Sequence, residues 1–111
     1  MDLTLLAEKL NMEARCGVDS MSNEVSGGYA GDLLSDVMTN SKKGDVWITC
    51  QSHQNIVAVS VLKEHAGIIL VLGKQPDKDT VEKANRERIP LLITKLSGFE
   101  TAGKIYNLLH P

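Results

Sequence analysis

The chain has 111 residues, a formal net charge of −2 and a hydrophobic content of 42%. This length suits one domain, residues 1–111, which can bury a core without disulfides or a structural metal. Basic residues form no stripe and aromatic residues make up only 4%, so we expect no nucleic acid among the partners.

The first thirty residues predict one helix and two short strands. Apolar side chains recur at helical spacing over residues 3–10, with Asp2 or Thr4 as the capping residue. Residues 13–16 and 23–26 are weaker patterns, and each predicts a short strand.

A glycine-rich segment, residues 27–31, predicts a flexible turn before a second helix. Asp32 is the expected N-cap of that helix, which runs over residues 33–40. The glycines lack the lysine and the Ser/Thr ending of a phosphate-binding loop, so we interpret them as turn geometry.

From residue 46 onward, strands and helices alternate. Apolar runs predict strands at residues 46–49, 67–72 and 90–94. The segments between and after them predict helices at residues 54–65, 76–88 and 97–109. Short connections between alternating elements favour parallel pairing with right-handed crossovers. The predicted fold is therefore α/β, with three α/β/α layers around a mainly parallel sheet.

Residues 55–62 are the ambiguous segment, because their β-branched side chains also suit a strand. We predict a helix, since the flanking strands need a crossover between them. Such an apolar helix would be buried nearly all round, and one of its faces could meet a second subunit. In the last helix, Phe99, Ala102, Ile105, Tyr106 and Leu109 share the apolar spacing.

Three polar loops follow the predicted strands, at residues 51–55, 73–75 and 95–97. Parallel strands gather such loops at one edge of the sheet, where helix N-termini and lysines favour anions. The alternative is an ordinary polar rim without a ligand. The pocket would bind a small anion such as an adenine nucleotide, through Thr49, Gln51, Ser52, His53, Asn55, Gly73, Lys74, Lys95 and Ser97.

Catalytic and metal chemistry find little support in the sequence. His53 lacks a recognisable partner acid, and no nucleophile motif surrounds Ser52. We interpret Cys50 as a buried small residue; the alternative is a reactive thiol, because a helix N-terminus lowers the pKa of a thiol. We expect His65 and His110 to be surface or helix-end residues. We therefore expect no catalytic residues, no metal and no cofactor.

The two cysteines are far apart in sequence and include no C-x-x-C pair. No signal peptide and no membrane-spanning run is recognisable, so we expect free thiols, no membrane association and a cytoplasmic location.

Four sequence motifs resemble the DRTGG domain family over residues 3–109. They are Trp47-Ile48-Thr49, Ile68-Ile69-Leu70 leading to Gly73 and Pro76-Asp77, Ile89-Pro90-Leu91, and Ser97-Gly98-Phe99-Glu100-Thr101-Ala102. DRTGG domains occur beside CBS domains and are similar to the N-terminal domain of HPr kinase/phosphorylase. The family's Asp-Arg falls on Ser52-His53, and its Thr-Gly-Gly falls on Val71-Leu72-Gly73, which indicates a divergent, stand-alone member.

The resemblance implies regulation and homodimerisation rather than catalysis. HPr kinase has its phosphate-binding loop in a separate domain, so kinase activity is not implied. The leading hypothesis is a non-catalytic regulatory domain that binds a small anionic ligand at the loop edge. The alternatives are a dimerisation or protein-interaction module without a ligand, and a small enzyme that uses His53 or Cys50.

Overall fold

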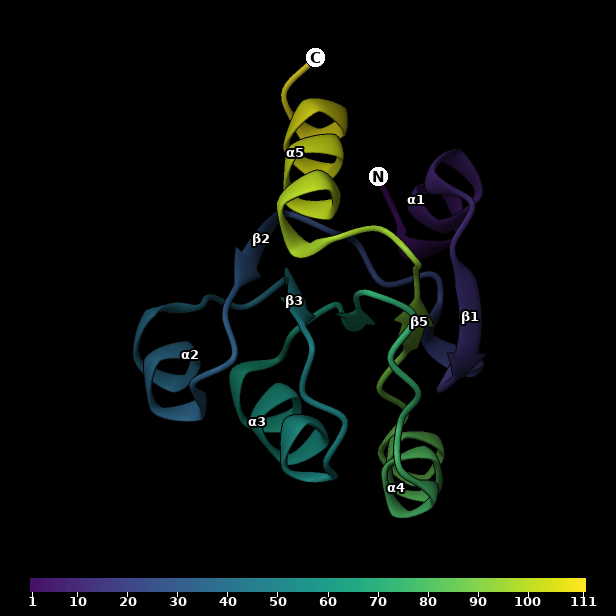
Figure 1. Cartoon of the computed structure of the whole chain (residues 1–111), viewed down its shortest axis with the longest axis vertical. Coiled ribbons are helices and arrows are strands. Elements are labelled where there is room, and N and C mark those ends of the chain that lie inside the picture. The colour runs from purple at the N-terminus through teal and green to yellow at the C-terminus, as the bar shows by residue number, and fades with distance from the viewer.

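The computed structural model describes every residue from Met1 to Pro111 and is built around one five-stranded sheet (Figure 1). The strand order is β1-β5-β4-β3-β2. Strands β2 to β5 pair in parallel, whereas β1 pairs antiparallel with β5. The strands are β1 Glu13–Cys16, β2 Gly27–Ala30, β3 Asp45–Thr49, β4 Gly67–Leu70 and β5 Leu91–Ile93.

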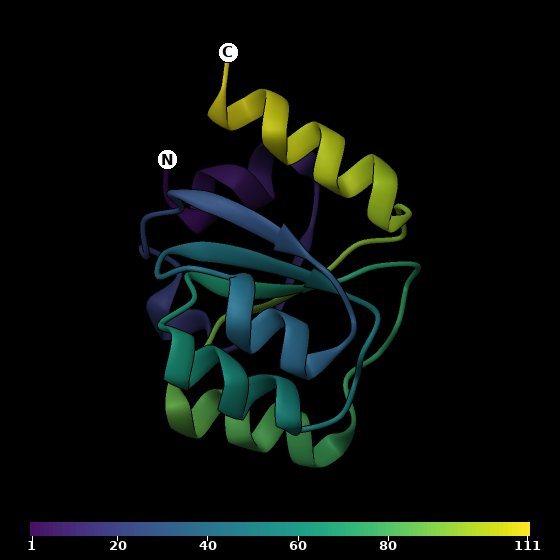
Figure 2. The ribbon, with the colours of Figure 1, turned by 90° about the vertical axis from the view of Figure 1, so that its left-hand side faces the viewer.

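Five α-helices cover the two faces of this sheet. They are α1 Leu3–Leu10, α2 Leu34–Asn40, α3 Asn55–Lys63, α4 Lys78–Glu87 and α5 Gly98–Leu109. A short 3-10 helix, Val18–Ser20, follows β1. Helices α1 and α5 lie on one face, and α2, α3 and α4 lie on the other (Figures 1 and 2). The predicted α/β class with three layers is confirmed. No helix is long and apolar enough to cross a membrane.

The core has one hydrophobic cluster on each side of the sheet. In β3, Val46 and Ile48 belong to the cluster beneath α1 and α5, while Trp47 belongs to the cluster above α3 and α4. Successive side chains of a strand point to opposite faces, so a strand covered on both sides must be apolar throughout. This explains the continuous apolar runs of β3, β4 and β5, whose residues are all buried, including the polar residues Asp45 and Thr49 at the ends of β3.

Helix ends follow local sequence closely. The Asp2 side chain accepts a hydrogen bond from the Leu5 amide at the start of α1, and Asn11 ends that helix in the left-handed conformation. Ser97 and Glu100 form a reciprocal capping box at the start of α5. Because each cap needs only residues within one helical turn, these boundaries could be predicted from the sequence.

Three predictions for the segment before α2 were wrong. Residues 23–26 form no strand, and the glycine-rich segment is strand β2, paired in parallel with β3 along its whole length. Asp32 does not cap α2: its N-cap is Leu33, which makes no side-chain capping bond. Glycine has little intrinsic preference for a strand, so this strand depends on backbone pairing with its neighbour.

Two apolar surfaces are more exposed than predicted. The segment 55–62 is helical as expected, but Leu62 is 71% exposed, so α3 is not buried all round. In α5, Ile105 is buried whereas Phe99 is 92% exposed and Tyr106 is 64% exposed. Helical spacing predicted the buried face of α5 only in part, because only Thr101 and Ile105 of this helix are buried.

Candidate functional site

A cleft of about 610 Å³ opens at the edge of the sheet where the parallel strands end. It lies between the end of α1, the start of β1, the loop after β4, the end of β5 and the side of α5. The lining residues are Lys9, Leu10, Asn11, Glu13, Gly73, Gln75, Ile93, Thr94, Lys95, Leu96 and Lys104.

The antiparallel strand β1 determines the position of the cleft. Glu13, the first residue of β1, lies opposite Ile93, the last residue of β5. The turn between α1 and β1 therefore lies beside the loop that follows β5. Asn11 makes this turn with a φ of 53°, a left-handed conformation that asparagine tolerates better than most residues.

The charged side chains of the cleft are predominantly basic. Lys9, Lys95 and Lys104 are exposed and form no ion pair. The only lining carboxylate, Glu13, accepts a hydrogen bond from Arg15 Nε, and this bond lowers the pKa of Glu13. The lysine charges are thus not neutralised by any neighbouring acid, which is an arrangement suited to an anion.

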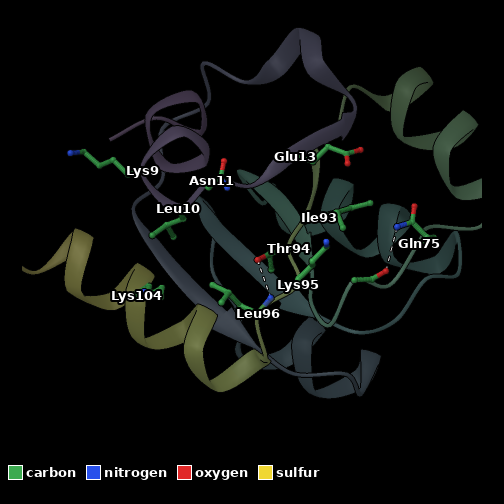
Figure 3. Close-up of a pocket in the computed structure, with 11 residues that line it drawn as sticks. Lys9, Leu10, Asn11, Glu13, Gln75, Ile93, Thr94, Lys95, Leu96 and Lys104 are labelled. Carbon is green, nitrogen blue, oxygen red and sulfur yellow. Dashed lines mark hydrogen bonds between the residues drawn. The ribbon is translucent and has the colours of Figure 1, made fainter.

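Figure 3 shows how these side chains are distributed along the cleft. Lys9 and Lys104 lie at one end, with Lys9 extending outward, and Glu13 and Gln75 lie at the other end. Lys95 lies between the two ends. Arg15 donates a hydrogen bond to Gln75 Oε1, and Gln75 Nε2 donates to the Gly73 carbonyl at 3.3 Å. This end of the cleft is therefore polar and already internally hydrogen-bonded.

Two of the residues predicted for the site, Gly73 and Lys95, line this cleft. Sequence reasoning missed six polar lining residues, which belong to α1 and the turn after it, to β1, to α5 and to the loops after β4 and β5. The positions of Asn11 and Glu13 depend on the antiparallel pairing of β1, for which short strand patterns carry no signal. The six missed residues are Lys9, Asn11, Glu13, Gln75, Thr94 and Lys104.

Thr49 and Gln51, also predicted for the site, are bound to Asp32 instead of facing the cleft. The Thr49 hydroxyl and the Cys50 amide donate to Asp32 Oδ1 at 2.7 and 2.9 Å. Gln51 Nε2 donates to the Asp32 carbonyl at 3.1 Å. Partial burial raises the pKa of Asp32, but the two bonds to its carboxylate outweigh this effect and the pKa is lowered. Asp32 thereby joins the ends of β2 and β3.

Ser52, His53 and Asn55 are held near the starts of α3 and α4. The Ser52 carbonyl accepts bonds from the Thr80 hydroxyl at 2.7 Å and from the Asp77 amide at 3.1 Å. His53 Nδ1 accepts from the Asn55 amide at 3.2 Å, which holds the imidazole beside the first residue of α3. The loop after β3 is therefore tied to the helices on the face opposite to α1 and α5.

The two remaining predicted residues have separate environments. Lys74 is exposed and lies outside the lining of the cleft, in the loop that also contains Gly73. The Ser97 hydroxyl accepts from the Glu100 amide at 3.1 Å and donates to the Glu100 carboxylate at 3.1 Å. Ser97 is consequently occupied by the capping box, and the nine predicted residues do not form one pocket.

The geometry around Cys50 and His53 bears on the enzymatic alternative. Cys50 is half-buried, and burial together with the neighbouring Asp32 raises the pKa of its thiol. A raised pKa disfavours the reactive thiolate. His53 has no hydrogen bond to a carboxylate or to a nucleophile. No group of three His, Cys, Asp or Glu side chains is placed to hold a metal ion.

His65 is buried, with 4% of its surface exposed, contrary to the prediction of a surface residue. Ser41 Oγ donates to the Val37 carbonyl at 2.6 Å, so it must accept from His65 Nε2 at 2.8 Å. Nδ1 then accepts from Ser60 Oγ at 2.9 Å. Burial lowers the pKa of His65 to about 4, and the ring is held as the neutral Nε2-protonated tautomer. His110, by contrast, is exposed at the end of α5, as predicted.

The fold matches a crystal structure of the CBS and DRTGG domains of the regulatory region of Clostridium perfringens pyrophosphatase, complexed with the activator diadenosine tetraphosphate. The TM-score is 0.73 at 17% identity, over 92% of this chain and 44% of the other. This chain has a DRTGG-like fold. It spans less than half the length of the matched chain. No protein-family model and no curated protein matches the sequence.

Proposed function

We propose that this chain is a non-catalytic regulatory domain that binds a small anionic ligand, such as an adenine nucleotide, at the carboxyl edge of its parallel strands. The observation that carries the proposal is the cleft with three lysines that lack an ion-pair partner. A volume of about 610 Å³ lies within the range of small-molecule sites.

The residues predicted for the site have two roles in this proposal. Gly73 and Lys95 line the cleft and are close to the ligand, whereas Lys74 lies outside the lining in the same loop as Gly73. The other predicted residues hold the surrounding loops through the bonds described above, and they are Thr49, Gln51, Ser52, His53, Asn55 and Ser97.

The regulatory part of the proposal draws on the matched structure. That protein is a pyrophosphatase regulatory region complexed with a nucleotide activator. By analogy, ligand binding to this chain would control a partner or a second subunit. The proposal places the protein in the cytoplasm, which is supported by two cysteines that form no disulfide.

Thermal unfolding in the presence of nucleotides tests the proposal. A ligand that binds only the folded state raises its stability in proportion to the logarithm of ligand concentration. We expect ATP or ADP at millimolar concentration to raise the melting temperature, with sodium chloride of equal ionic strength as the control. The absence of a shift with every adenine nucleotide would contradict the proposal.

A second candidate function, homodimerisation or binding of a partner protein, is favoured by the apolar surface of α3. Leu62 is 71% exposed and the adjacent Val61 is 39% exposed. Single exposed apolar residues are common, so this observation is weaker than the cleft. Light scattering at high protein concentration should show a dimer that Leu62→Glu converts to a monomer. A wild-type monomer would exclude the self-association.

A further inference from the structure

The charges that line the cleft are unusual for this protein. The whole chain carries a net charge of −2, yet three unpaired lysines surround one cleft. They come from three different elements: Lys9 from α1, Lys95 from the loop after β5, and Lys104 from α5. Grouping three cations raises their mutual repulsion, so a cleft of this kind favours a ligand with several negative charges.

The remaining walls of the cleft are formed by Asn11, Gly73, Gln75, Thr94 and three aliphatic side chains. Leu10, Ile93 and Leu96 are aliphatic, and no aromatic side chain lines the cleft. A nucleotide base is usually bound by stacking on an aromatic ring or an arginine plane, and by hydrogen bonds to its edge. Gln75 is already hydrogen-bonded to Arg15 and to the Gly73 carbonyl. The cleft thus offers charge for an anion but no platform for a base.

We propose that the cleft recognises a chain of three or more phosphates and does not discriminate between bases. This inference rests on the proposed function and specifies its ligand class. The lysines are distributed along the cleft, with Lys9 and Lys104 at one end and Lys95 nearer to Gln75 (Figure 3). A phosphate chain can contact both positions, whereas a single phosphate reaches fewer of the ammonium groups.

Lysine recognition has consequences that can be measured. An ammonium group is a point charge on a flexible stem and lacks the two-pronged geometry of arginine, so affinity should follow the number of phosphates. Exposed charges are also screened by salt, so affinity should fall as ionic strength rises. Ligands that differ only in the base should bind equally.

Titration calorimetry with inorganic tripolyphosphate, ATP, GTP, AMP and adenosine tests these consequences on the full chain. Because a lysine ammonium interacts with phosphates through its charge, we expect the affinities of tripolyphosphate, ATP and GTP to agree within roughly threefold. AMP should bind more weakly, and adenosine should not bind. The inorganic probe distinguishes a free polyphosphate from a nucleotide as the source of the phosphates.

Charge-matched variants locate the binding to the cleft. The triple variant Lys9→Gln, Lys95→Gln and Lys104→Gln should weaken binding of tripolyphosphate on the order of 10- to 100-fold, at about two- to fivefold per exposed charge pair. A second triple variant removes three lysines outside the cleft and so produces the same net charge. It should bind nearly as wild type, and it changes Lys42, Lys78 and Lys83 to glutamine.

The possible results separate this inference from the proposed function. If AMP binds as tightly as ATP while tripolyphosphate does not bind, the phosphate-chain inference is wrong but an anionic nucleotide ligand remains. If both triple variants lose affinity equally, net charge and not the cleft determines binding, which also overturns the inference. If none of the probes binds, both the inference and the proposed function fail.

Discussion

Two polar regions lie at the carboxyl edge of the sheet, and they differ in how their polar groups are used. In the loop after β3, Thr49, Cys50 and Gln51 all donate hydrogen bonds to Asp32. In the cleft beside β5, Lys95 and Lys104 have no ion-pair partner. Groups that satisfy each other stabilise the fold, whereas unpaired charges remain available for a ligand.

The comparison implies that polarity alone does not identify a site. The loop after β3 has the more distinctive sequence, and it includes Ser52-His53, which the sequence resemblance aligned with the Asp-Arg of DRTGG domains. Most of its polar groups, however, form hydrogen bonds to neighbouring loops and helices. The cleft has an unremarkable sequence, because its lysines are scattered over three elements. Substitutions should therefore affect stability in the first region and ligand binding in the second.

The largest effect on stability should come from His65, because both nitrogens of its buried ring are hydrogen-bonded to serine hydroxyls. Its pKa is about 4 in the folded protein and about 6.5 when unfolded, so between these values only the unfolded state takes up the proton. Stability is therefore full above about pH 7 and should fall by about 3 kcal/mol as the pH approaches 4. Urea unfolding at pH 7.5 and 4.5 measures this loss.

A control variant distinguishes the pH dependence caused by His65 from that caused by the carboxylates. A His65→Gln variant should be less stable at neutral pH but should lose this part of the pH dependence. His53→Gln, at an exposed histidine, should keep the wild-type dependence. An unchanged pH profile in His65→Gln would show that the buried imidazole is not responsible.

Asp32→Ala should lower the free energy of unfolding by about 2 kcal/mol, because the Thr49 hydroxyl and the Cys50 amide lose a charged acceptor. Asp32→Asn keeps an acceptor oxygen and should lose about half as much. Chemical unfolding at neutral pH measures both values. Wild-type stability in Asp32→Ala combined with lost ligand binding would reverse the assignment of this loop as structural.

Ser97→Ala should cost about 1 kcal/mol of stability through loss of the N-cap of α5. Ser22→Ala, at an exposed serine without a side-chain hydrogen bond, is the matched control and should be neutral. Unfolding curves and a ligand titration should be recorded on both variants. A binding defect in Ser97→Ala at unchanged stability would make this serine part of the site.

The smallest effect on stability is expected in the cleft itself. Lys95→Gln and Lys104→Gln remove exposed, unpaired charges, so stability should stay within about 0.5 kcal/mol of wild type. Within this range the direction should be a slight gain, since repulsion between the lysines is relieved. Thermal unfolding without ligand is the measurement. A clear loss of stability would mean that these lysines make structural contacts, and the contrast between the regions would disappear.

Prediction from sequence succeeded where the signal is local. The spacing of Leu3, Leu6 and Ala7, the Ser97 cap and the apolar runs of the central strands each involve residues within a turn or a strand. Prediction failed for β2 and for the environment of His65. The burial of that histidine requires Ser41 and Ser60, which come from different segments of the chain.

The sequence by itself determined the order of helices and strands from β3 onward, the α/β class and most helix ends, because periodicity and capping are short-range properties. Only the tertiary structure decided that β1 runs antiparallel beside β5, that Gly27–Ala30 is a strand, and that Asp32 anchors β3. It also brought Lys9, Lys95 and Lys104 together at one cleft. Strand pairing joins residues that are distant in sequence, and no local pattern records which partners will meet.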